Sequence, residues 1–195
     1  NELYTSDWRA FDTEKSQLPR ELHYFNILRK KTFEKYPDTL GLNNIYISRK
    51  EVASPNNQHC SVSRMCVNED EILNVLSENG LGFHRVRLGA VSIREKVLQM
   101  SSAENIVVDA GSSTNNILFS KAPKTVVILT DEFHHRFEIN LMKEQILYIN
   151  PDCQVFEIKG LNVGRSRGNP VISDKLVRPF WVDPYEVYRV LKKDK

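Results

Sequence analysis

The sequence lacks several features that would assign a functional class directly. No apolar run approaches the roughly 20 residues that a membrane-spanning helix needs. The formal net charge of the 195 residues is only +2, so no overall basic field indicates a nucleic-acid partner. Short basic runs at residues 29–31 and 165–167 are typical of solvated surface. With 41% hydrophobic and 27% charged residues, the composition is that of one ordinary globular domain.

Cysteine is scarce, and the common phosphate-binding fingerprints are missing. The three cysteines (Cys60, Cys66 and Cys153) show no metal-ligand spacing. They favour a reduced compartment, while one disulfide stays open as an alternative. Neither a G-x-G-x-x-G pattern nor a Walker lysine pattern occurs, which disfavours an ordinary dinucleotide fold and a P-loop. The chain begins at Asn1 with no signal-like segment, as expected of a fragment or a processed piece.

The chain divides into an arm and one domain. Residues 1–19 are polar with scattered aromatic side chains and no clear period, which predicts an irregular amino-terminal arm. Apolar residues at spacings of three to five predict a helix over 20–36, which Pro37 ends. We therefore expect the domain to cover 20–195.

Short β-branched runs alternate with helical patterns along this domain. Asn68 is expected to cap one helix, Ser92 and Glu95 form a capping box for the next, and Asp183 starts a last helix over 183–193. Such alternation predicts an α/β fold, a Rossmann-like parallel sheet with helices on both faces. Its roughly five strands are expected at residues 45–48, 83–88, 106–108, 125–129 and 154–158.

The segment 104–119 is expected to be a strand, a small-residue loop and a helix start. Gly111 allows a tight turn and close approach of backbone to a ligand. The N–H groups at the helix start, with the hydroxyls of Ser112 and Ser113, would suit a phosphate outside the carboxyl end of the strand. A purely structural junction is an equally common explanation of such a loop.

Two arginines strengthen this prediction. Arg49 ends the strand at 45–48, and Arg64 shortly precedes the Asn68 cap. Two arginines at one sheet edge can hold a diphosphate through planar, bidentate bonds. The alternative is a pair of surface arginines that make ion pairs.

Taken in order, these residues resemble the carboxyl-terminal half of glycosyltransferase family 61. The resemblance rests on residues 45–49, on Arg64 followed by Asn68 and Glu69, on residues 82–83 and 88–97, and on the loop 111–119. The family includes bacterial capsule and lipopolysaccharide enzymes and eukaryotic xylosyl- and N-acetylglucosaminyltransferases.

The resemblance implies a fold, a reaction and a set of residues. The fold would be the donor-binding domain of a GT-B enzyme in polysaccharide biosynthesis, without cofactor or metal. The enzyme would take a sugar from a nucleoside-diphosphate donor, most simply a UDP-sugar, and transfer it to a glycan or protein hydroxyl. The transfer would invert the configuration of the anomeric centre. Arginines and helix N–H groups would replace a cation at the diphosphate. The nucleotide-binding residues implied by the family motif and its loop are Arg49, Arg64, Asn68, Glu69, Gly111, Ser112, Ser113 and Asn116.

The sequence departs from the family in two ways. Many members have histidine where this chain has Ala110, and only about 40 residues precede the first strand. An amino-terminal acceptor half would then be missing, lie on a second chain, or have been lost together with catalysis. The leading hypothesis is a glycosyltransferase or its donor-binding half. The alternatives are a non-catalytic Rossmann-like partner module and another phosphate-handling Rossmann enzyme.

Candidate catalytic residues lie at two expected strand ends. Asp109 ends one strand, and Asp131, Glu132 and His134 follow the next. Acids and a histidine there could touch the sugar or deprotonate an acceptor hydroxyl; the alternative is that they are loop and helix-cap residues. We expect no nucleic-acid partner and no membrane span, and the bacterial type of relative favours the cytoplasmic side over the secretory lumen.

Overall fold

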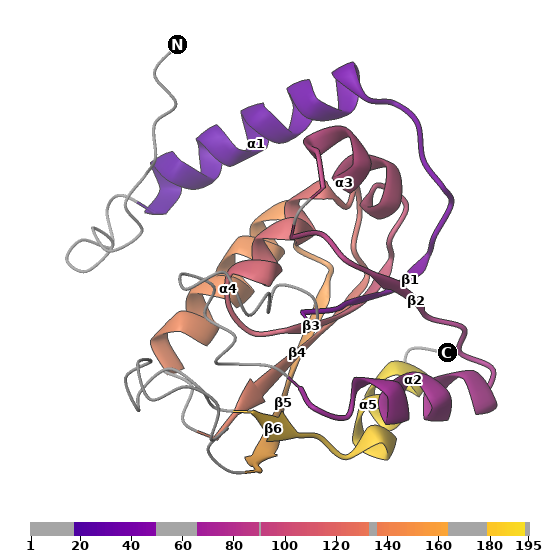
Figure 1. The fold of residues 1–195 in the computed structure, drawn as a ribbon. Helices are drawn as coiled ribbons and strands as arrows, with labels where there is room; N and C mark the ends of the chain where they lie inside the picture. The colour runs from indigo at the N-terminus through magenta and orange to yellow at the C-terminus, as the bar shows by residue number, and fades with distance from the viewer. Residues whose placement is uncertain (1–17, 50–65, 90, 133–135, 164–178, 194–195) are drawn as a thin grey trace, which may run out of the picture.

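A computed structural model describes residues 18–49, 66–89, 91–132, 136–163 and 179–193 (Figure 1). Most of the expected arm and the segment holding Arg64 lie outside the described residues, and so does His134. The domain boundary at residue 20 therefore stays a prediction.

A six-stranded sheet forms the centre of the molecule, in the order β2-β1-β3-β4-β5-β6. The five strands β1 to β5 run parallel, and β6 pairs antiparallel with β5. The prediction of a Rossmann-like α/β sheet is confirmed. The strands are β1 (Asn44–Ile47), β2 (His84–Val86), β3 (Asn105–Asp109), β4 (Thr125–Asp131), β5 (Gln154–Asn162) and β6 (Phe180–Trp181).

Both faces of the sheet are covered by helices, because side chains alternate along each strand. Residues such as Tyr46 and Val107 pack in one core with α2 (Glu69–Glu78) and α5 (Pro184–Lys192). Their neighbours, such as Ile47 and Val108, pack in a second core on the other face. That face is covered by α3 (Ile93–Met100), the 3₁₀ helix η2 (Ser112–Phe119) and α4 (Arg136–Ile149). The amino-terminal helix α1 (Leu18–Lys35) lies outside α4 and η2 as a further layer (Figure 1).

Helix starts follow local chemistry with one exception. The predicted capping box at Ser92 and Glu95 is present, and the Asp183 carboxylate accepts the Tyr185 N–H at 3.0 Å. Asn68 does occupy the N-cap position of α2, but its side chain makes no capping bond, so that part of the prediction is wrong. The amide is used elsewhere: it donates to the Val182 carbonyl at 2.8 Å and accepts the Val182 N–H at 3.1 Å. Asn68 thereby joins the start of α2 to the chain between β6 and α5.

Two elements were not assigned from the sequence, and one has a different type. The 14-residue helix α4 has buried Ile139 and Ile146 at helical spacing, a pattern that the sequence analysis left unassigned. The two residues of β6 are too few for any period to show. The loop at Gly111 leads into a 3₁₀ helix instead of an ordinary α-helix, because its hydroxyl and amide side chains bond to nearby backbone carbonyls.

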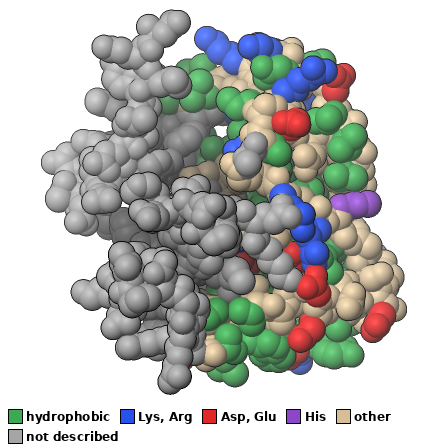
Figure 2. All heavy atoms as spheres, viewed as in Figure 1, with side chains coloured by type: hydrophobic (Ala, Val, Ile, Leu, Met, Phe, Trp, Pro, Cys, Tyr) green, Lys and Arg blue, Asp and Glu red, His purple; other side chains and the backbone are tan. Residues whose placement is uncertain are grey.

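Acidic and basic side chains are interspersed on the described part of the surface that Figure 2 shows. This mixture agrees with a formal net charge of +2.

Candidate functional site

The topological switch point of the sheet lies between β1 and β3. From β1 the chain moves to β2 on one side and then returns to β3 on the other side of β1. In open α/β sheets, ligands bind outside the carboxyl ends of the strands at such a reversal. Ser48 and Arg49 leave β1 here, and residues 109–111 leave β3. We call these two chain segments the β1/β3 exit.

Arg49 and Gly111 meet at the β1/β3 exit. The Arg49 Nη1 donates to the Ala110 carbonyl at 3.0 Å. Gly111 has φ of +127°, a conformation that residues with a Cβ rarely adopt, and an added Cβ would lie 2.8 Å from the Arg49 Nη1. Glycine is therefore needed here for its backbone, and a Cβ would also displace the end of the Arg49 side chain.

The loop after Gly111 is held by its own side chains. The Ser113 hydroxyl donates to the Asp109 carbonyl at 2.6 Å, and the Thr114 hydroxyl donates to the Gly111 carbonyl at 2.6 Å. The Asn116 amide donates to the Ser113 carbonyl at 3.0 Å. These bonds fix the start of η2, whose first N–H groups have no acceptor within the helix. Such N–H groups, next to a guanidinium, form a cradle that suits an anion.

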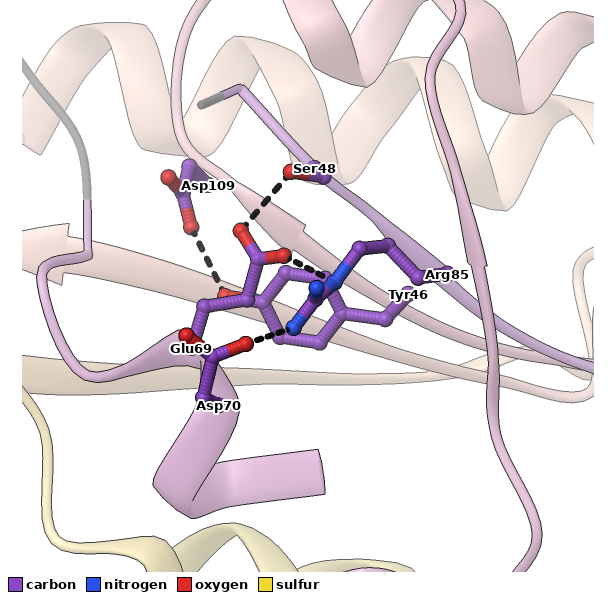
Figure 3. A network of polar contacts seen from close by, with 6 residues as sticks. All are labelled: Tyr46, Ser48, Glu69, Asp70, Arg85 and Asp109. Atoms are coloured by element: carbon purple, nitrogen blue, oxygen red, sulfur yellow. Dashed lines mark hydrogen bonds and ion pairs between the residues drawn. The ribbon is translucent and has the colours of Figure 1, made fainter. Parts of the chain in front are cut away.

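Asp109 is the last residue of β3, two positions before Gly111, and is enclosed by protein. The residue is 1% exposed, and its carboxylate accepts the Cys66 N–H at 3.0 Å. It also accepts the Tyr46 O–H at 3.4 Å (Figure 3). Burial raises the pKa of Asp109 to about 7, although the Cys66 N–H and the charge of Arg49 act in the opposite direction. A catalytic role for Asp109 stays a prediction, and it would require a substrate to reach this enclosed carboxyl.

Glu69 stands at the start of α2 in a network of buried polar groups (Figure 3). It is 1% exposed, accepts the Ser48 hydroxyl at 2.8 Å and forms an ion pair with Arg85, which also pairs with Asp70. Glu69 therefore ties the end of β1 to α2 and to β2. Its predicted contact with a nucleotide, like that of Asn68, is not tested by these contacts, all of which are made to protein.

Asp131 and Glu132 lie at the same edge of the sheet, because β4 is the neighbour of β3 and runs parallel to it. Asp131 is buried and pairs in register with Gly160 of β5, whereas Glu132 is exposed.

Arg64 and His134 lie outside the described residues. Among the residues that the structure describes, no group of three histidine, cysteine or acidic side chains is gathered so that it could hold a metal.

Sequence reasoning missed Tyr46, Cys66 and Arg85. Tyr46 is a polar-tipped residue between Ile45 and Ile47 in an otherwise apolar buried strand, and this was a usable signal. Cys66 takes part through its backbone N–H, which no sequence pattern reveals. Burial raises the pKa of its thiol to about 12, so the thiol is neutral at physiological pH.

Comparison with known proteins assigns the family. A family model described as Glycosyltransferase 61 matches residues 5–128, which is more than half of the chain. The matched part contains β1, α2, β2, α3, β3 and η2, and thus the whole β1/β3 exit. A search of curated proteins gave no match. In the described part of the chain, no helix is long and apolar enough to cross a membrane. The chain belongs to glycosyltransferase family 61.

Proposed function

We propose that this chain binds a nucleoside-diphosphate sugar, most simply a UDP-sugar, at the β1/β3 exit and transfers the sugar to a glycan or protein hydroxyl. The observation that carries the proposal is the position of Arg49. Its guanidinium lies 3.0 Å from the Ala110 carbonyl, directly beside Gly111 and at the reversal point of the sheet. A cation in that position, next to the start of a helix, matches a diphosphate in charge and geometry.

Arg49 and the start of η2 would act on the leaving group. When the bond between the anomeric carbon and the diphosphate oxygen breaks, negative charge develops on that oxygen. Fixed positive groups in place before the reaction stabilise this charge without a metal. Arg64, which precedes Cys66 by two positions in the sequence, is proposed as the second cation. Attack from the opposite side of the sugar would invert the anomeric centre.

The attacking hydroxyl needs a base, and the proposed candidates follow β4. Glu132 is exposed next to buried Asp131, and His134 comes two positions later in the sequence. A carboxylate or a neutral imidazole there could take the acceptor proton. An acceptor-binding half, on the same gene product or on a second chain, would bring the hydroxyl to this edge.

A second candidate function is a non-catalytic Rossmann-like module that binds a partner. Ala110 favours it, because the position lacks the histidine of many relatives and its carbonyl is occupied by Arg49. Turnover assays of the full-length gene product with several nucleotide sugars separate the two, since hydrolysis or transfer would exclude the module. Binding of phosphate compounds without preference for sugar nucleotides would instead indicate another phosphate-handling Rossmann enzyme.

Calorimetric titration with uridine diphosphate tests the proposal. We expect saturable binding, and we expect Arg49→Ala or Arg64→Ala to weaken it by about 1.5–3 kcal/mol, as for the loss of a charged hydrogen bond. Lys124→Ala is the control, because it removes a cation at the opposite edge of the sheet, where Lys124 pairs with Glu104. Folded protein that shows no saturable binding of uridine diphosphate or another nucleoside diphosphate would contradict the proposal.

A further inference from the structure

Asp109 connects three segments that are far apart in the sequence. Its carboxylate accepts the Cys66 N–H at 3.0 Å, just before α2 begins, and the Tyr46 O–H of β1 at 3.4 Å. Its backbone carbonyl accepts the Ser113 hydroxyl at 2.6 Å. Figure 3 shows the carboxyl directed towards the Tyr46 hydroxyl below the end of β1. One residue therefore fixes the entry to α2, the strand β1 and the Gly111 loop relative to one another.

These contacts border both sides of the donor site proposed above. Arg49 is bonded to the Ala110 carbonyl, one residue after Asp109. Arg49 and Cys66 are thus both bonded to the end of β3, Arg49 to Ala110 and Cys66 to Asp109. Loss of the Asp109 carboxylate would remove the acceptor of the Cys66 N–H, whereas the acceptor of Arg49, the Ala110 carbonyl, would remain.

The surroundings of the Asp109 carboxyl are mixed in charge. Tyr46 faces it from β1, Cys66 from the segment before α2, and Glu69 from α2, and among the described residues Arg49 is the cation that acts on it. Burial and the Glu69 charge raise the pKa of Asp109, whereas the Cys66 N–H and Arg49 lower it. The resulting value of about 7 means that the charge beside Arg49 changes near neutral pH.

We propose that Asp109 is a positioning residue for the donor: it fixes the Cys66 end of the site against β3 and sets the negative charge that competes for Arg49. This inference rests on the proposed function. A neutral carboxyl at Asp109 adds no negative charge near the bound diphosphate. The ionised carboxylate attracts the same guanidinium and repels the ligand, so donor affinity falls as Asp109 ionises.

Asp109→Asn tests the effect of charge, because the amide oxygen can still accept the Cys66 N–H. We expect wild type and this variant to bind uridine diphosphate equally at about pH 6, and the variant to bind about threefold to tenfold more tightly at about pH 8. Ionisation of the ligand itself is common to both proteins and cancels in the ratio of their dissociation constants. The same ratio at both pH values would overturn the inference.

Asp109→Leu tests the positioning, because it removes the acceptor of the Cys66 N–H. Amide hydrogen exchange should show lost protection at Cys66, and uridine diphosphate should bind about tenfold more weakly than to Asp109→Asn, which also lacks the charge, at both pH values. The matched control is Asn105→Leu, which removes the bond from Asn105 to Asn44 (2.8 Å) between the same two strands at their amino ends. That variant should bind like wild type.

The outcomes are separable. Absence of binding by wild type overturns the proposed donor site and, with it, this inference. If wild type binds while Asp109→Leu keeps the affinity of Asp109→Asn and the Cys66 protection of wild type, only the inference fails. Should Asp109→Leu not fold, the pH ratio for Asp109→Asn decides alone.

Discussion

The parallel strands begin at one edge of the sheet, which we call the amino edge, and end at the opposite edge, which we call the carboxyl edge. The side chains at these two edges differ in chemistry. At the amino edge, neutral groups join β1 to β3: the Asn43 carbonyl accepts the N–H groups of Glu104 and Asn105, and the Asn105 amide donates to the Asn44 side chain. Cations are also present: half-buried Arg29 of α1 donates to the Ser120 carbonyl at 2.7 Å, and Lys124 on the surface pairs with Glu104. At the carboxyl edge, three acidic side chains are buried, namely Glu69, Asp109 and Asp131.

This difference identifies the edge at which function is expected. Removing a carboxylate from water is costly unless partners compensate, and an ordinary strand-to-helix connection needs no such group. Perturbed pKa values gather at sites that bind ligands or carry out chemistry. At the amino edge, no acidic side chain of the described residues is buried. Of these three acids, Asp109 directly precedes the Ala110 carbonyl that Arg49 contacts, and we interpret its burial as support for the Arg49 and Gly111 pair.

The largest expected effect comes from breaking the ion pair at the carboxyl edge. Arg85→Met leaves Glu69 buried without its cation, and we expect a loss of about 3 kcal/mol in the free energy of unfolding. The Arg85 side chain is 29% exposed, so the pair is only partly screened by water. Lys124→Met breaks the exposed pair at the amino edge and should cost less than about 0.5 kcal/mol. Urea denaturation measures both, and equal losses would remove the contrast between the edges.

The next effect is a dependence of stability on pH. The pKa of Asp109 is raised from 3.8 to about 7 in the folded protein, so the folded state binds this proton more tightly than the unfolded chain. The stabilisation is complete below the unfolded value and is lost as the pH rises through 7. Between about pH 5 and pH 8 the free energy of unfolding should fall by about 2–3 kcal/mol.

Asp109→Asn should flatten that profile, because the amide does not titrate. Urea unfolding at several pH values compares the variant with wild type. Parallel profiles for the two proteins would show that Asp109 does not titrate in this range.

A smaller effect compares two glycines of positive φ, one at each edge. Gly111→Ala strains a backbone with φ of +127° and places a Cβ 2.8 Å from Arg49, so we expect a loss of about 2 kcal/mol and weaker binding of uridine diphosphate. Gly80→Ala strains φ of +76° at the end of α2, but the Cβ would meet nothing within 4 Å. That variant should lose about 1 kcal/mol and keep its affinity. Equal affinities of the two variants would indicate that Arg49 is not a ligand.

The sequence could predict most of the framework of the fold. The apolar runs at β3 and β4 have a length and composition that only a sheet buried on both faces accommodates, and they placed these strands correctly. The capping box at Ser92 fixed the start of α3. The antiparallel β6 could not be foreseen, because its two residues are positioned by pairing with distant Leu161 and Asn162.

The candidate site could be predicted only in part. Arg49 and Gly111 were identified from strand ends, and their contact follows from the parallel pairing of β1 with β3. The enclosure of Asp109 could not be inferred, because it depends on a backbone N–H of Cys66, 43 positions away. The use of Asn68 as a link to Val182 was hidden for the same reason, since that contact spans 114 positions.

Backbone amide shifts, followed by NMR during titration with uridine diphosphate, test the central claim most directly. If the carboxyl edge binds the diphosphate, the amide signals of Arg49, Gly111 and Ser113 will shift together and saturate with one dissociation constant. The amide signals of Asn44 and Asn105 at the amino edge will not shift. Shifts concentrated at the amino edge, or no saturable shift at Gly111, would contradict the account.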